Sequence, residues 1–129
     1  MHFLLLAALL ISVSLPAAAQ ANRKTLNQVS QLILKAYHLL SDDNDTKAAR
    51  VECEKALVID KNVNDPFVSA TVHVCFGDVE DYAGNQPEAC RQYESALKSF
   101  KAVPAKHSAH RTLGTHINVT KGKRLQLGC

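Results

Sequence analysis

Three histidines near the end of the chain are the residues whose spacing comes closest to a metal site. They are His107, His110 and His116. A helix would bring the first two onto one face, because residues three apart lie on the same side of a helix. A zinc site needs three or four ligands at fixed geometry, and no further ligand is an obvious member nearby. We therefore expect scattered surface histidines without a metal, and we keep a metal-binding or enzymatic role for them as a third alternative.

Four cysteines could serve as free thiols or as two disulfides. They are Cys53, Cys75, Cys90 and Cys129, and they allow three complete pairings. The sequence contains no C-x-x-C, which argues against a redox motif and against a ribbon-type zinc site. Cys75 and Cys90 lie equally far from a turn expected near residues 82–83, so we predict a disulfide between them. Cys53 would then stay a buried thiol or pair with Cys129.

Other motifs of catalysis are missing from the sequence. It contains no glycine-rich phosphate loop, no G-x-S-x-G and no H-E-x-x-H. Nothing in it would clearly activate a nucleophile or hold a cofactor. We therefore expect neither enzymatic activity nor a bound cofactor.

The first 21 residues have the pattern of a cleaved signal peptide. The apolar run Phe3–Leu15 is too short to span a bilayer, and small residues of the A-x-A type follow it. Cleavage after Ala19 or Ala21 would leave a mature chain that starts at Gln20 or Asn22. We expect export to the periplasm or out of the cell, with no membrane span after cleavage. The alternatives are a buried first helix and a retained anchor.

Charge is distributed unevenly along the chain. All twelve acidic residues lie between Asp42 and Glu94, and only basic charges follow Glu94. The basic C-terminal segment could dock on the acidic body, attract a charged partner, or serve only to keep the chain soluble. Its basic residues are not interleaved with aromatic side chains that stack on bases. We therefore expect no nucleic-acid partner.

The spacing of apolar residues predicts four amphipathic helices. Apolar side chains recur at intervals of three and four over residues 25–40, 46–59, 66–80 and 87–101. Asp45 and Asp65 are expected to cap the second and third of these helices. Asn44 and Gly84 tolerate the left-handed backbone that a tight turn can need.

The C-terminal segment gives weaker signals. After Pro104, apolar residues recur every four positions, which favours a short fifth helix that ends at Gly114 or soon after. Residues 117–127 alternate around a central Lys-Gly-Lys, so they would form a β-hairpin or stay disordered.

Two helix pairs repeat with an offset of forty residues. The first unit carries the pattern Ala49-x3-Cys53-x2-Ala56. The second unit resembles the tetratricopeptide (TPR) repeat, and the resemblance covers roughly residues 28–103. The residues that carry it in the second unit are Phe76, Gly77, Ala89, Tyr93 and Ala96. We expect Gly77 to lie at a close crossing of two helices, with Ala89 facing it.

These patterns predict an all-α protein. It would consist of two antiparallel TPR-like helical hairpins and a short C-terminal helix, after a cleaved signal peptide. The expected division is a signal peptide over residues 1–21, a hairpin domain over 22–103 and a basic segment over 104–129.

The resemblance implies a groove lined by the leading helix of each hairpin. The residues expected on this partner-binding face are Gln31, Leu34, His38, Thr71, Val74 and Asp78. We expect an exported protein–protein interaction module or scaffold, whose partner is another protein or a second copy of the chain. The alternative is a disulfide-stapled helical bundle that acts as an inhibitor or effector. Stacked hairpins would leave an open groove, whereas a closed bundle would have none.

Overall fold

The computed structural model describes residues 19–129, and the apolar run of the predicted signal peptide lies outside them. Over the described residues the chain forms five α-helices and no strands, which confirms the all-α class. None of these helices is both long and apolar enough to cross a membrane. The helices are α1 (Arg23–Ser41), α2 (Thr46–Val63), α3 (Pro66–Tyr82), α4 (Gln86–Lys101) and α5 (His110–Leu127).

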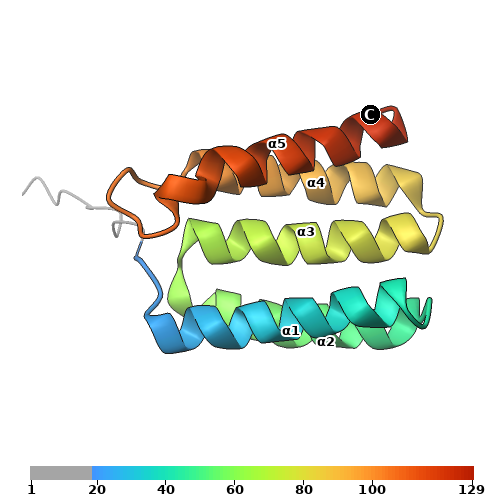
Figure 1. Cartoon of the computed structure of the whole chain (residues 1–129), viewed down its shortest axis with the longest axis horizontal. Helices are drawn as coiled ribbons and strands as arrows, with labels where there is room; N and C mark the ends of the chain where they lie inside the picture. Colours follow the sequence, from blue (N-terminus) through green and yellow to red (C-terminus); the bar gives the residue numbers. More distant parts are fainter. Residues whose placement is uncertain (1–18) are drawn as a thin grey trace, which may run out of the picture.

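Consecutive helices run antiparallel and form two hairpins followed by α5 (Figure 1). α1 packs against α2 and α3 packs against α4, while α3 also contacts α1 and α2. α5 packs against α4. α1 and α5 lie at opposite edges of the molecule with α3 between them (Figure 1). Within the described residues α1 and α4 do not form a packed pair, as they would in a closed four-helix bundle.

Local side chains determine where the helices begin. Asn22, Asp45 and Asp65 each accept a hydrogen bond from a first-turn N–H, so both predicted aspartate caps are confirmed. Asn44 and Gly84 have left-handed backbones, with φ of 49° and 79°. The two hairpin turns are thus made by the residue types that tolerate this conformation.

Gly77 of α3 lies directly against the ring of Tyr93 of α4. A Cβ added to Gly77 would be 2.5 Å from Tyr93 Cε1, and its three nearest atoms all belong to this ring. The predicted close crossing at Gly77 is confirmed, but the facing residue is Tyr93 and not Ala89. Side chains of a helix lean toward its N-terminus. The ring of Tyr93, which lies one turn after Ala89, therefore covers the part of α3 that Ala89 was expected to contact.

α5 continues through Gly114, where a helix end was predicted, and through residues 117–127, where a β-hairpin or disorder was predicted. All of these predictions are wrong. Gly114 and Gly122 lie inside the helix, where each costs roughly 1 kcal/mol relative to alanine. Tertiary contacts offset this cost, because Leu113 and Ile117 pack on a buried cluster that includes Phe100. The periodicity of the sequence gives no information about such contacts between distant segments.

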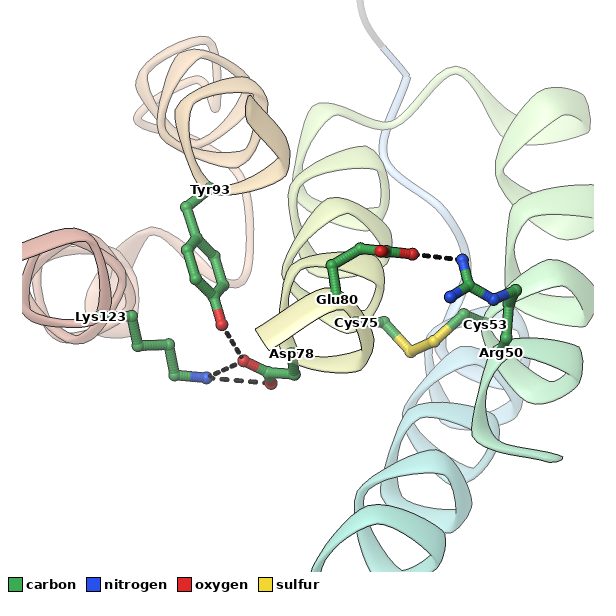
Figure 2. The surroundings of a disulfide bond; sticks show 7 residues. All are labelled: Arg50, Cys53, Cys75, Asp78, Glu80, Tyr93 and Lys123. Carbon is green, nitrogen blue, oxygen red and sulfur yellow. Dashed lines mark hydrogen bonds and ion pairs between the residues drawn. A yellow bond between two sulfur atoms is a disulfide. The ribbon is translucent and has the colours of Figure 1, made fainter. Parts of the chain in front are cut away.

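Two disulfides cross-link the chain, and the predicted Cys75–Cys90 bond is not one of them. Cys53 pairs with Cys75 across a Cα–Cα distance of 5.8 Å, and Cys90 pairs with Cys129 across 6.0 Å. Cys75 points from α3 toward α2 (Figure 2). The prediction used only the position of Cys75 along the α3–α4 hairpin and not the direction in which its side chain points. Two disulfides indicate an oxidising compartment such as the extracellular space.

Candidate functional site

An apolar groove lies between α1 and α3, and α5 borders it through one histidine. Its volume is about 320 Å³. A hollow of this size can receive a few apolar side chains of a partner or a small molecule. The lining residues are Leu26, Val29, Ser30, Ile33, Leu34, Tyr37, Phe67, Val68, Thr71 and His116.

α1 forms one wall of the groove because apolar side chains continue from its buried face onto the neighbouring exposed face. Val29, Ala36 and Leu40 are buried against the other helices. Leu34 and Tyr37 lie on the next face, and 56% and 51% of their surface is exposed. Large apolar side chains beside an apolar hollow mark a surface that a partner could cover.

Aromatic rings form the opposite side. The Phe67 ring lies 5.3 Å from His116 between centroids, and His116 stacks on Phe100 at 5.6 Å. Burial among these groups lowers the pKa of His116. This ring is therefore neutral at pH 7, and none of the described lining residues carries a charge.

Two of the six residues predicted for the partner-binding face, Leu34 and Thr71, line this groove. The predicted face contained none of the other eight lining residues, among them Leu26, Tyr37 and Phe67. The apolar spacing of α1 was a visible signal for the first two. It could not show which part of the apolar surface the neighbouring helices leave uncovered.

The structure places the other four predicted face residues elsewhere. Gln31 lines a separate hollow between α1 and α2. His38 lies 3.3 Å from Asp42 at the end of α1, and Val74 packs on the buried cluster under α5. Asp78 is engaged with α4 and α5, so these four do not form one face with the groove.

Asp78 connects three helices (Figure 2). It accepts hydrogen bonds from the Tyr93 hydroxyl at 2.6 Å and from Lys123 Nζ at 2.8 Å. Burial, together with the charge of Asp78, raises the pKa of Tyr93, so the hydroxyl keeps its proton and remains a donor. Lys123 Nζ also lies 5.8 Å from the centroid of the Tyr93 ring. Asp78 therefore holds α5 in place.

A second ion pair lies beside the Cys53–Cys75 disulfide (Figure 2). Glu80 of α3 pairs with Arg50 of α2, and its other oxygen accepts a hydrogen bond from Asn85 Nδ2 at 3.0 Å. The Glu80 carboxylate is nearly buried, with 8% of the side chain exposed. Both of its oxygens are satisfied by neighbouring side chains, so its role is structural.

The three histidines lie in separate environments. His107 is buried and its Nε2 lies 2.9 Å from Asp65 Oδ2, while its Nδ1 accepts a hydrogen bond from the Ala109 N–H. His116 lies among aromatic rings, and His110 is exposed. In the described part of the chain, no three histidine, cysteine or acidic side chains are grouped so that they could hold a metal ion.

Asp65 joins three segments of the chain. It accepts hydrogen bonds from the Phe67 N–H at 2.8 Å and from the Ala21 N–H at 2.7 Å, in addition to the bond with His107. Because Nδ1 of His107 is an acceptor, the proton of this ring lies on Nε2 and is donated to Asp65. The start of α3, the N-terminal segment and the loop before α5 are therefore fixed together.

No family model, curated protein or solved structure matches this chain. The interpretation of the groove therefore depends on its own geometry. Its walls carry exposed apolar side chains and no ionised group in the described lining. Such a surface is suited to burying the apolar side chains of a partner.

Proposed function

We propose that this chain is an exported, TPR-like module that binds a protein segment through the groove between α1, α3 and α5. The observation that carries the proposal is the exposure of Leu34 and Tyr37 at the edge of an apolar hollow. Because about half of each side chain is already buried, covering the rest of one contributes on the order of 1 kcal/mol. The uncharged lining favours a binding role over a catalytic one.

The helix arrangement supports a TPR-like architecture. α1 and α3 are neighbours, and α5 packs on α4 as the leading helix of a further repeat would. α1, α3 and α5 lie in one layer, in front of α2 and α4 (Figure 1), as the leading helices that line the binding side of repeat proteins do. A closed bundle acting as an inhibitor or effector would instead bring α1 against α4.

The disulfides support export. Cys53–Cys75 and Cys90–Cys129 would be difficult to keep oxidised in a reducing cytosol. The predicted signal peptide would deliver the chain to the periplasm or out of the cell. The partner is then expected in the same compartment.

A paired substitution tests the binding role. Leu34→Asp places a charge at the groove, and Val58→Asp places the same charge on α2, where Val58 is 62% exposed. The exported wild-type chain and both variants are used to capture proteins from the native compartment, after melting curves confirm that all three fold. We expect Leu34→Asp to lose a captured protein that Val58→Asp retains. Equal capture by the two variants would rule out the groove as the binding site.

A further inference from the structure

A stripe of exposed residues runs along α1 from end to end, beside the groove. Its members follow one another at alternating intervals of four and three. Residues at this spacing lie on one face of a helix, and two of them, Leu34 and Tyr37, are large, apolar and exposed. The residues of the α1 stripe are Arg23, Asn27, Ser30, Leu34, Tyr37 and Ser41.

The α1 stripe is complementary to a reversed copy of itself. When two stripes lie antiparallel and are centred between Ser30 and Leu34, each Leu34 lies opposite the Ser30 of the other chain. The same register places each Tyr37 opposite an Asn27. A large side chain thus meets a smaller one at these positions, as close packing of two helices requires.

The two ends of α1 carry opposite charges. Arg23 and Lys24 begin the helix, and Asp42 and Asp43 follow its last residue. α1 itself contains no acidic residue, and all four of these charged residues are exposed. In the antiparallel register, each basic end meets the acidic end of the other copy. Opposite charges at both ends would determine the direction of pairing.

The groove offers a place for the partner stripe. Ser30, Leu34 and Tyr37 belong both to the stripe and to the groove lining.

We infer that the groove binds α1 of a second copy of this chain and forms a symmetric, antiparallel dimer. This inference rests on the proposed function, because it uses the same groove and identifies its occupant. Two-fold symmetry means that each contact is made twice. The Leu34 and Tyr37 side chains of both copies become covered together.

Reversal of the end charges tests the antiparallel register. One variant carries Arg23→Glu with Lys24→Glu, and the other carries Asp42→Lys with Asp43→Lys. Each variant alone places like charges opposite one another at both ends, which should weaken its dimer roughly tenfold or more. Both sets of changes are compatible with α1, because acids suit a helix start and bases suit a helix end.

Mixing the two variants gives the decisive measurement. In a mixed pair, opposite charges meet again at both ends, so sedimentation analysis should show dimers that neither variant forms well alone. The chain with all four changes should also regain the dimer. High salt should weaken the wild-type dimer by screening these exposed charges. Leu34→Asp should abolish the dimer and Val58→Asp should retain it.

Several outcomes would overturn the inference. A wild-type chain that stays monomeric at roughly 100 µM does not form this dimer at a useful affinity. A dimer that ignores the charge reversals, or that the mixture does not restore, is not paired in this register. If the chain is monomeric but Leu34→Asp still loses a captured protein, only the second-copy inference fails. If that substitution also has no effect on capture, the proposed groove function fails with it.

Discussion

His107 donates a hydrogen bond from Nε2 to Asp65, 42 residues away in the chain, in the protein interior. The pair joins the loop before α5 to the start of α3. The N–H of Ala21 donates to the same carboxylate. Three segments distant in sequence therefore depend on one buried charge.

Asp65→Ala should lower the free energy of unfolding by roughly 2–4 kcal/mol. The substitution removes the cap of α3 and leaves the donors of His107 and Ala21 without a partner in the interior. Urea unfolding measures the change. Glu54→Ala, at an exposed position of α2, serves as the control and should stay within about 0.5 kcal/mol of wild type. A loss no larger than that of the control would contradict the structural role of Asp65.

The Asp65 carboxylate also favours one of the two predicted cleavage positions. Cleavage after Ala21 would remove Ala21, whose N–H donates a hydrogen bond to Asp65. It would also remove Gln20, whose side chain makes two hydrogen bonds with Ser108. Cleavage after Ala19 keeps all of these bonds. We expect mass spectrometry of the native protein to show a mature chain that begins at Gln20. A chain that begins at Asn22, or one that is not cleaved at all, would disprove this.

Gly77→Ala should destabilise the protein by roughly 1–3 kcal/mol, although alanine is the better helix former. The added methyl group would overlap the buried ring of Tyr93. Gly114→Ala is the matched control, because its added Cβ meets open space and should stabilise α5 by roughly 0.5–1 kcal/mol. Thermal melts of the two variants should therefore shift in opposite directions.

Non-reducing peptide mapping should recover Cys53–Cys75 and Cys90–Cys129 as the two linkages. Cys53 and Cys75 are buried, whereas Cys129 is exposed. A mild thiol reductant should consequently open Cys90–Cys129 first. Alkylation followed by mass spectrometry identifies the first pair to react. Labelling of Cys53 or Cys75 before the other two would contradict the burial of their bond.

Acid should destabilise the fold in part through His116. Burial lowers the pKa of this ring in the folded state below its ordinary value of 6.5. As the pH falls through 6.5, the unfolded chain binds the proton first, so the free energy of unfolding decreases. His116→Gln should make the loss of stability between about pH 7 and about pH 5 shallower. His110→Gln, at an exposed position, should leave the slope unchanged, and equal slopes for both variants would refute the assignment.

Local features of this fold could be predicted from the sequence, because their causes lie within a few residues. The caps at Asp45 and Asp65 and the left-handed turns at Asn44 and Gly84 depend on neighbouring backbone groups alone. The spacing of apolar residues likewise predicted the first four helices. These signals act over one or two helical turns.

Features that depend on the rotation of one helix against another could not be predicted in this way. Cys75 lies at the right height to reach Cys90, yet it faces α2 and pairs with Cys53. The groove similarly depends on which side of α1 the other helices leave open, so only Leu34 and Thr71 were identified in advance. A helical spacing pattern shows that a face is apolar, but it does not identify what covers that face.

The construction of α5 has a consequence for the order in which the chain folds. This helix has no side-chain N-cap and contains Gly114 and Gly122, so it has little tendency to form alone. The partners that hold it in place, Asp78 and Cys90, belong to α3 and α4. Residues 110–127 can therefore become stably helical only after the second hairpin exists. In hydrogen exchange, the amides of α5 should open at a lower free energy than those of α3, without unfolding of the remaining helices.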